Sequence, residues 1–389
     1  MKKEYINIPF SIPDIGDEEI NAVVETLRTG WITTGPQSKK FEDEFKAYLG
    51  GNVEAIAVNS ATSGLHLALE SLGVGVGDEV IVPTLTFTAT AEVVRYLGAD
   101  PVLVDIDPTT MNIDPAKILT AITSRTKVII PVHYAGLACQ MDVIFSIAKR
   151  HNLKVIEDAA HALSSTYNKK MIGELQSDIT VFSFYANKNI TTGEGGMVVT
   201  RNISLAKRMK IMRIHGIDRD AFDRFNSSKS SWNYKIVAPG FKYNLSDIMA
   251  SMGRVQLRRL PEFLKRREVL ARRYIDNLSD LPLIMPSTAL YGDIHAWHLF
   301  VIRLKDSAMI NGFNRDKVIK LLSGKGIGTS VHYTPLHRHP YWKDTYNLDS
   351  NMFPLAEKAF QSMISIPLYT LMSDKDQDYV ISTIRGIFK

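Results

Sequence analysis

The sequence predicts an α/β protein in which a mainly parallel central sheet is followed by a smaller α+β domain. Between about residues 54 and 200, short apolar runs rich in Val and Ile alternate with helical patterns. Such runs are typical of strands buried on both faces, and their alternation with helices favours parallel strands covered on both sides. After about residue 255, long helical stretches surround one or two strands. We therefore expect a large domain with an N-terminal arm over residues 1–255 and a small domain over residues 256–389.

Local patterns predict the individual elements. Two helices come first, over about residues 17–29 and 38–49, and the Gly- and Pro-containing segment 30–36 joins them as a loop. The strands of the large domain are expected at Ala55–Val58, Glu79–Val82, Pro101–Val104, Lys127–Val132, Lys154–Glu157, Ile179–Phe184 and Met197–Thr200. In the small domain we expect helices over residues 263–280, 314–324 and 373–388, and strands at His298–Leu304 and Gly328–Tyr333.

The composition is that of an ordinary globular protein, with 45% hydrophobic and 22% charged residues. Lys and Arg number 46 and Asp and Glu number 41, and the resulting charge of +5 permits anionic ligands without requiring nucleic acid. The single Cys139 excludes an internal disulfide and a zinc site built on cysteines, and no HExxH pattern occurs. No uncharged apolar run reaches the roughly 18 residues of a membrane helix. We expect a cytoplasmic protein without a metal, a membrane or a nucleic-acid partner.

Two of the expected strands end in groups that suit an anionic or cationic ligand. After Val58 the chain continues as Asn59-Ser60-Ala61-Thr62-Ser63-Gly64 into a helix. Small hydroxyl residues at a helix N-terminus can bind a phosphate, although a plain N-cap has the same appearance. The strand 154–157 is followed by Asp158, which would face the ligand crevice or cap a helix.

Lys188 stands between an apolar strand and a glycine-rich turn that returns into a second apolar strand. A lysine held there would be partly desolvated, and desolvation lowers its pKa and frees the amine as a nucleophile. Together these features indicate a pyridoxal phosphate site, because that cofactor needs a lysine, an acid for its ring nitrogen, a phosphate cradle and an aromatic face. Lys188, Asp158, the segment 60–64 with Ser183, and Phe87 can fill those places.

The sequence resembles the DegT/DnrJ/StrS family of pyridoxal-phosphate-dependent nucleotide-sugar aminotransferases. The resemblance extends from Gly30–Pro36 to His332–His337 and is most specific in Ile156–His161 and in the segment from Phe182 to Gly196. It implies the aspartate-aminotransferase-like fold, known as PLP fold type I. It also implies a homodimer with both active sites at the subunit interface.

The resemblance implies a role for each matching residue. Lys188 would form the imine with the cofactor, Asp158 would pair with the pyridinium nitrogen, and His161 would lie beside the phenolic oxygen. Phe87 would stack on the ring. The residues expected at the cofactor phosphate are Ala61, Thr62, Ser183 and, reaching across to the partner subunit's cofactor, Asn244. The expected sugar contacts are Trp31, Thr33, Thr34, His332 and Tyr333.

The family includes dehydrases in which His replaces the lysine, so the presence of Lys188 favours transamination through pyridoxamine phosphate. The segments His133–Gly136 and His295–Phe300 resemble the branch that makes UDP-4-amino-4-deoxy-arabinose. The resemblance therefore favours amination by L-glutamate at C4 of a UDP-linked keto-sugar, for surface polysaccharide, lipopolysaccharide or O-antigen synthesis. The candidate cations for the diphosphate are Arg219, Arg224, Lys242 and Arg338.

Three alternatives stay open at this point. One is a C3-specific or dTDP- or GDP-linked sugar aminotransferase of the same family. Another is a different lysine-dependent pyridoxal phosphate enzyme, such as a dehydratase or lyase. The last is a regulator that keeps the fold and binds a ligand without turnover.

Overall fold

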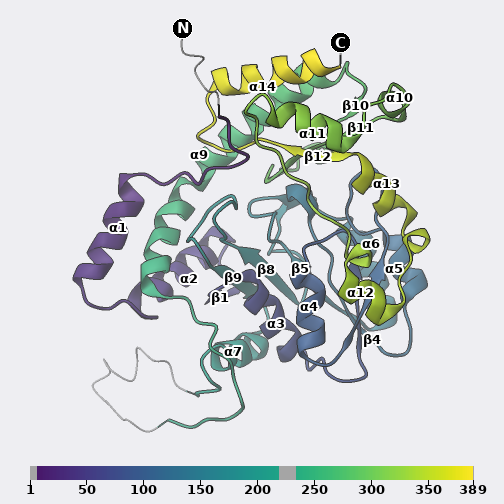
Figure 1. Cartoon of the computed structure of the whole chain (residues 1–389). Helices are drawn as coiled ribbons and strands as arrows, with labels where there is room; N and C mark the ends of the chain where they lie inside the picture. Colours follow the sequence, from purple (N-terminus) through teal and green to yellow (C-terminus); the bar gives the residue numbers. More distant parts are fainter. Residues whose placement is uncertain (1–6, 219–233, 389) are drawn as a thin grey trace.

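The computed structural model describes residues 7–218 and 234–388, and its centre is a seven-stranded sheet (Figure 1). The strand order is β1-β9-β8-β5-β4-β2-β3. The strands are β1 (Glu54–Val58), β2 (Glu79–Pro83), β3 (Asp100–Val104), β4 (Thr126–Ile129), β5 (Lys154–Asp158), β8 (Ile179–Ser183) and β9 (Gly196–Thr200). Within this sheet β9 runs antiparallel to both of its neighbours, and the other pairs are parallel. The predicted mainly parallel sheet is confirmed.

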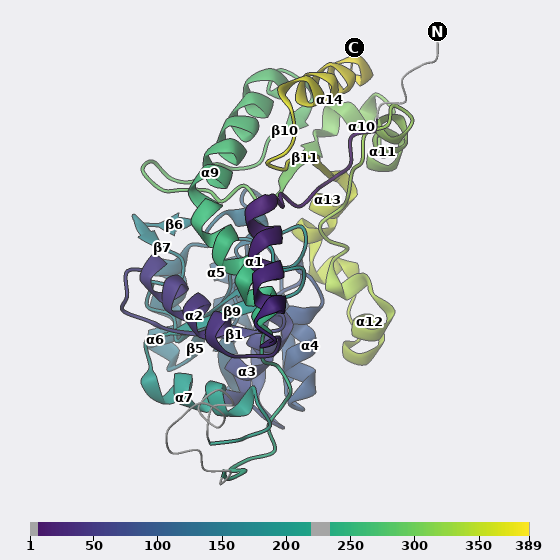
Figure 2. The ribbon, with the colours of Figure 1, turned by 90° about the vertical axis from the view of Figure 1, so that its left-hand side faces the viewer.

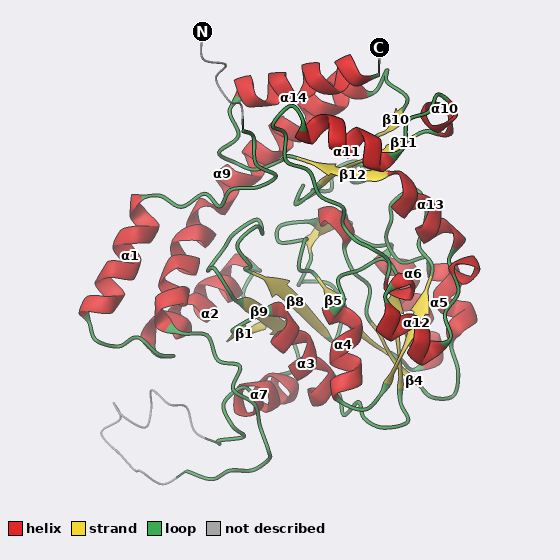
Figure 3. Ribbon diagram, in the orientation of Figure 1, coloured by secondary structure: helices red, strands yellow, loops and turns green. Residues whose placement is uncertain are grey.

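Helices cover both faces of this sheet, as Figure 3 shows. One layer consists of α3 (Ala61–Ser71), α4 (Ala89–Tyr96) and α7 (Ile203–Met212). The other layer consists of α2 (Pro36–Tyr48), α5 (Pro115–Ala121), α6 (Met141–His151) and the N-terminal half of α9 (Asp247–Leu278). In β1, Ala55 and Ala57 pack into the second layer, and Ile56 and Val58 pack into the first. This alternation follows from the two-residue period of a strand and explains the continuous apolar runs.

The small domain is built on a second sheet of order β10-β11-β12. Its strands are β10 (Leu283–Ile284), β11 (Phe300–Leu304) and β12 (Met363–Ile366). The C-terminal half of α9, α11 (Arg315–Ser323) and α14 (Asp374–Ile387) enclose its core, which Figure 2 shows above the large domain. Residue 255, the expected domain boundary, lies inside α9. α9 thus connects the two cores as one continuous helix.

The remaining α-helices and strands of the described residues lie around the two main cores. They are α1 (Asp17–Arg28), β6 (Thr166–Tyr167), β7 (Lys170–Met171), α10 (Asp306–Ile310), α12 (Pro340–Tyr346) and α13 (Pro354–Ser362). α12 lies against the large domain, because Leu336 and Trp342 belong to the core beneath α3 and α4. Among the described residues, no helix combines the length and apolarity needed to cross a membrane.

Three expected elements differ from the structure by three residues or more. The expected strand 328–333 forms only an isolated bridge at Ser330, because the backbone at Gly328 instead bonds to Ile8 of the N-terminal arm at 2.8 Å. The expected strand 127–132 ends at Ile129. The helix expected from residue 263 begins at Asp247, since Pro261 is accommodated inside α9. A proline often marks a helix boundary, but buried contacts along both halves of α9 override that local tendency here.

Candidate active site

The predicted catalytic residues meet at the carboxyl edge of the central sheet, where a cavity of about 430 Å³ opens. Ligands bind at this edge in open α/β sheets because the connecting loops gather there. The predicted residues that line the cavity are Ala61, Thr62, Phe87, Asp158, His161, Ser183, Lys188, His332 and Tyr333. They come from segments that are distant in sequence, and the parallel strand ends bring them together.

Lys188 lies in the connection between β8 and β9 and faces this cavity. Its backbone N–H donates to Tyr185 O at 2.9 Å, which closes the turn that presents the side chain. Burial lowers the pKa of the Lys188 amine to about 8, although the nearby Asp158 carboxylate opposes the shift. About a tenth of the amine is therefore neutral, and nucleophilic, at pH 7, far more than for an ordinary lysine.

Asp158 ends β5 and is held at both carboxylate oxygens. Thr90 Oγ1 donates to Oδ2 at 2.9 Å, and the Ala160 N–H donates to Oδ1 at 3.1 Å. Burial raises the pKa of this carboxyl, and the two hydrogen bonds and Lys188 act in the opposite direction. A protonated ring nitrogen placed beside Asp158 would favour the ionised form further. Sequence reasoning missed Thr90, because a threonine in the first turn of a helix carries no distinctive signal.

The N-terminus of α3 provides the expected phosphate cradle. Ser60 Oγ accepts from the Ser63 N–H at 3.1 Å, and Ser60 O accepts from the Gly64 N–H at 3.1 Å. Among the described residues, these bonds leave the N–H groups of Ala61 and Thr62 without an acceptor, as expected for the first turn of a helix. Both residues line the cavity, so their N–H groups suit a phosphate there.

His161 is a buried neutral imidazole in the wall of the cavity. Its Nδ1 accepts from the Ala135 N–H at 3.2 Å, so the ring proton belongs on Nε2, which lies 2.9 Å from Tyr333 Oη. Burial and the Lys188 charge lower the pKa of His161 well below its usual value. His298, which sequence reasoning missed, packs against His161 with ring centroids 4.4 Å apart and the ring planes tilted by 40°. Histidine is common in both structural and functional sites, so sequence alone could not separate the two.

His332 and Phe87 frame the opening of the cavity. His332 Nδ1 lies 2.8 Å from Ser365 Oγ, and burial lowers the pKa of His332 to about 4. The Phe87 ring is 57% exposed and lies 5.8 Å from the Tyr333 ring. A partly exposed ring at the rim is free to cover a flat ligand that enters the cavity.

Four predicted residues do not line this cavity within one chain. Asn244 and Thr34 line a different cavity of about 300 Å³, where Asn244 Nδ2 donates to Thr34 Oγ1 at 2.5 Å. Trp31 and Thr33 belong to the loop that precedes α2 and line neither cavity. Their predicted roles in binding cofactor or sugar stay predictions.

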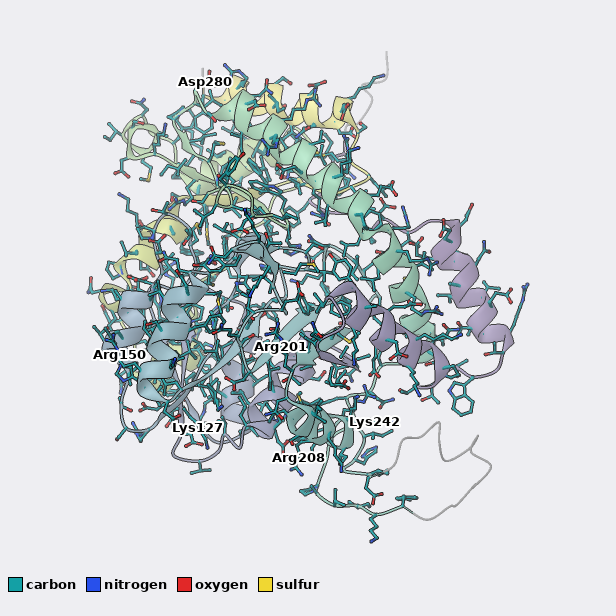
Figure 4. The ribbon with its side chains drawn as sticks, turned by 180° about the vertical axis from the view of Figure 1, so that it is seen from behind. Lys127, Arg150, Arg201, Arg208, Lys242 and Asp280 are labelled. Carbon is teal, nitrogen blue, oxygen red and sulfur yellow. The ribbon has the colours of Figure 1, made fainter. Side chains whose placement is uncertain are left out.

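The candidate diphosphate cations are also separate from the cavity. Lys242 is exposed on the outer surface of the molecule, where Figure 4 labels it. Arg338 Nε is 3.0 Å from Glu357 Oε1 and is already paired. Arg219 and Arg224 lie outside the described residues.

The residues present fit pyridoxal phosphate. Within the described residues, Lys188 Nζ makes no hydrogen bond or ion pair, the N–H groups of Ala61 and Thr62 lack an acceptor, and Asp158 keeps unused lone pairs. Lys188 would hold the aldehyde carbon, Asp158 the ring nitrogen, and Ala61 and Thr62 the phosphate.

Known proteins resemble this chain over nearly its whole length. The sequence pattern of the DegT/DnrJ/EryC1/StrS aminotransferase family matches residues 13–385. The spore coat polysaccharide biosynthesis protein SpsC of Bacillus subtilis is 44% identical over 383 residues, which cover 98% of this chain and 97% of SpsC.

Solved structures agree with this match. Spr1654 of Streptococcus pneumoniae, assigned as a sugar aminotransferase, superposes in its PMP form with a TM-score of 0.91 at 38% identity, covering 98% of this chain and 99% of that one. Its PLP form gives a TM-score of 0.90 at 37% identity and covers 98% of each chain. Helicobacter pylori PseC, an aminotransferase of pseudaminic acid biosynthesis, gives 0.88 at 29% identity and covers 98% and 99%.

Proposed function

Because the chain belongs to the DegT/DnrJ/EryC1/StrS aminotransferase family and is a pyridoxal-phosphate-dependent transaminase, we propose that it aminates C4 of a UDP-linked keto-sugar with L-glutamate as donor. The observation that carries the proposal is the meeting of Lys188, Asp158 and the α3 N-terminus around one cavity. The name of SpsC, a spore coat polysaccharide biosynthesis protein, supports a role in polysaccharide synthesis. We propose that the product is a sugar of a surface polysaccharide or lipopolysaccharide. We place the reaction in the cytoplasm.

Lys188, Asp158 and His161 have separate roles in the proposed reaction. When bound, pyridoxal phosphate supplies an electron sink for the carbanion formed at the donor's α-carbon. Lys188 Nζ, whose pKa is about 8, would move a proton from that carbon to the cofactor in the first half of the reaction, and from the cofactor to the keto carbon of the sugar in the second half. Asp158 would keep a proton on the ring nitrogen, and His161 Nε2 would donate its N–H to the phenolic oxygen. The fixed Nδ1 bond to Ala135 holds that imidazole in one tautomer.

A substrate panel tests this function. The purified enzyme is incubated with glutamate and UDP-, dTDP- and GDP-linked keto-sugars, and the amino sugar is detected by mass spectrometry. We expect turnover with the UDP-linked 4-keto-sugar and an amine at C4 by NMR. Amination at C3, or turnover only with another nucleotide, would contradict the proposal. The Lys188→Ala variant is the control for non-enzymatic amination.

A chemical label tests the lysine separately. Borohydride reduces the bond between an enzyme lysine and bound pyridoxal phosphate, and peptide mapping then locates the modification. We expect the label on Lys188. A label on any other lysine would end the assignment of the site.

We also propose that the enzyme is a homodimer in which Asn244 contacts the partner subunit's cofactor. The proposal is supported by the place of Asn244, which lines the cavity of about 300 Å³ and not the cavity beside Lys188 of its own chain. The test co-refolds two inactive variants, Lys188→Ala and Asn244→Ala, each inactive alone. In a mixed dimer, one site receives an intact Lys188 and an intact Asn244, so activity should return. If no activity returns although light scattering shows dimers, Asn244 acts only within its own chain.

A further inference from the structure

A small cavity of about 10 Å³ adjoins the active site at Lys188. Asn187 and Lys188 line both this small cavity and the active-site cavity, so they form the wall between the two. The other walls of the small cavity come from residues 11–14 of the N-terminal arm, from α9 and from the turn at 186–191. Figure 1 shows the arm, in dark purple, crossing α9 before α1 begins. Lys188 therefore borders two separate spaces.

Several polar groups around the small cavity are paired with one another. Gln256 Oε1 accepts from the Thr191 N–H at 3.2 Å, and Gln256 Nε2 donates to Asp14 O at 2.8 Å. Thr370 Oγ1 donates to Asp14 Oδ2 at 2.8 Å, and Thr191 Oγ1 donates to Phe184 O at 3.2 Å. These bonds tie the N-terminal arm, α9 and the turn together, so the walls of the cavity are held in place.

Three other atoms in these walls are unpaired. Within the described residues, Asn187 Oδ1, Asn189 Oδ1 and Arg267 Nε are buried and have no hydrogen-bond partner. Asn189 Nδ2 donates to Ala296 O at 2.7 Å, which identifies Oδ1 as the unpaired end of that amide. The described residues contain six such side-chain atoms, and half of them belong to residues that line this one cavity. Because an unpaired buried polar atom is costly, this clustering indicates a shared partner.

Arg267 adds a buried charge to the small cavity. The residue is 4% exposed, and within the described residues it makes no ion pair with a carboxylate. Its Nη1 donates to the carbonyl oxygens of Trp297 at 3.0 Å, Leu368 at 3.2 Å and His298 at 3.4 Å. Burial lowers the pKa of Arg267 to about 10, so the guanidinium is still charged at pH 7. An acceptor for its Nε–H would relieve part of the cost of burying this charge.

The three unpaired atoms determine which ligand fits. The two amide oxygens need donors, whereas the Nε–H of Arg267 needs an acceptor. A metal ion cannot accept from an N–H, and chloride cannot donate to an oxygen, so neither serves all three atoms. Water donates and accepts, makes about three hydrogen bonds at such sites and needs roughly 10–15 Å³. The small cavity, of about 10 Å³, suits one water molecule.

We propose that the small cavity is a water site, and that its water accepts a hydrogen bond from the Lys188 amine whenever that amine is not bonded to the cofactor. The water would donate to Asn187 Oδ1 and Asn189 Oδ1 and accept from Arg267 Nε, and Lys188 Nζ would complete a set of four bonds. The two asparagines and Arg267 are positioning residues. The proposal rests on the proposed role of Lys188 as proton carrier, and adds where its amine is held between the two half-reactions.

A crystal structure of the enzyme loaded with pyridoxamine phosphate tests the site, because Lys188 makes no covalent bond to that form of the cofactor. We expect one water within hydrogen-bond distance of Arg267 Nε and both asparagine oxygens. Long-wavelength anomalous diffraction from crystals kept in potassium chloride distinguishes a chloride or potassium ion from water. An anomalous peak in the small cavity, or no density there, would overturn the proposal.

Asn187→Leu and Asn189→Leu test what the water does for Lys188. Each change removes one acceptor of the water at a similar side-chain size, and Asn189 does not line the active-site cavity. Without the water the charged amine loses a partner, so we expect the pKa of Lys188 to fall by about one unit, a tenfold change in proton affinity. NMR of the pyridoxamine-phosphate form, with lysine labelled at Cε and Lys188→Met for assignment, measures this pKa.

Asn187→Ser is the matched control, because it keeps an acceptor and leaves room for water, and its Lys188 pKa should stay near that of the wild type. Both leucine variants retain the other charged or titratable groups around the amine, so the shift reports the water. These groups are Asp14, Asp158, His161, Glu194, Arg267, His298 and His332. An unchanged Lys188 pKa in both leucine variants, with folding checked by thermal unfolding, would refute the role of the water. If neither variant folds, the crystal structure decides.

Failure of the water site is distinguishable from failure of the proposed function. If borohydride labels Lys188 and the enzyme aminates a nucleotide-linked sugar, but the small cavity holds no water, only the water site is refuted. If the label lies on another lysine, the role of Lys188 fails even when a water is present.

Discussion

Thr90 Oγ1 donates a 2.9 Å hydrogen bond to Asp158 Oδ2, from the first turn of α4 to the end of β5. A hydroxyl has a single proton, so Thr90 must accept in its 2.9 Å contact with Thr86 Oγ1. The order of donation is therefore fixed as Thr86 to Thr90 to Asp158. With Oδ1 held by the Ala160 N–H, the Asp158 carboxylate has one orientation.

Replacing Thr90 by Val should disturb that carboxylate without changing the local volume. Loss of a hydrogen bond to a charged group costs about 1.5–3 kcal/mol, so we expect kcat/KM for glutamate to fall roughly tenfold to a hundredfold. Thr90→Ser keeps the hydroxyl and should stay near wild type. The measurement is the initial rate with saturating cofactor, together with the cofactor's Kd. Wild-type kinetics in Thr90→Val would show that Asp158 does not depend on this contact.

Lys188→Met should abolish turnover and stabilise the cofactor-free protein. The folded-state pKa of Lys188, about 8, lies below the roughly 10.4 of an unfolded lysine. Below pH 8 Lys188 is charged in both the folded and the unfolded protein, and burial of that charge destabilises the folded state. Water in the cavity reduces this cost. We therefore expect the free energy of unfolding of Lys188→Met at pH 7 to be only roughly 1–3 kcal/mol higher than that of the wild type.

This gain should shrink as the pH rises from about 8 to 10.5, since the unfolded wild type then binds more protons than the folded state. Urea denaturation at several pH values measures it. A gain that is the same at pH 7 and pH 10 would mean that the stabilisation comes from packing alone. Residual transamination by Lys188→Met would contradict the proposed role of the amine.

His161 should stay neutral across the physiological range. Burial holds its pKa well below the usual value, and Nδ1 is already an acceptor. We expect the ring signals of His161 to show no titration between pH 5.5 and 8 in NMR spectra, with the assignment taken from the His161→Gln variant. A titration midpoint near 6.5 for that signal would refute the fixed tautomer.

Gly64 should tolerate no side chain, because α3 approaches the sheet closely there. A Cβ on Gly64 would lie 2.8 Å from Val181 Cγ1 and 2.9 Å from Val198 Cγ2. We expect Gly64→Ala to destabilise the protein by about 1–3 kcal/mol, as overpacking does in other cores. Gly75→Ala is the matched control, since nothing lies within 4 Å of its Cβ position. Thermal unfolding compares the two, and equal melting temperatures would show that α3 can shift.

Much of the large domain could be predicted from local pattern. Strands β1, β2, β3, β5, β8 and β9 lie within a residue of their expected bounds. A buried strand is apolar on both faces, and this property is visible in any single stretch of sequence. The strand expected at 328–333 could not be judged in this way. Gly328 bonds to Ile8, more than 300 residues earlier in the chain, and Ser330 bonds to Ser365.

The sequence by itself determined the chemistry: Lys188 after one apolar strand, Asp158 after another, and a hydroxyl-rich start to α3. Residue type and the preceding strand suffice for that inference, because parallel strands end at a common edge. Only the tertiary structure decided that Thr90 and His298 support this site, and that Asn244 lies apart from it. Such contacts join segments brought together by helix packing on the sheet, and their distances depend on the whole core rather than on any local pattern.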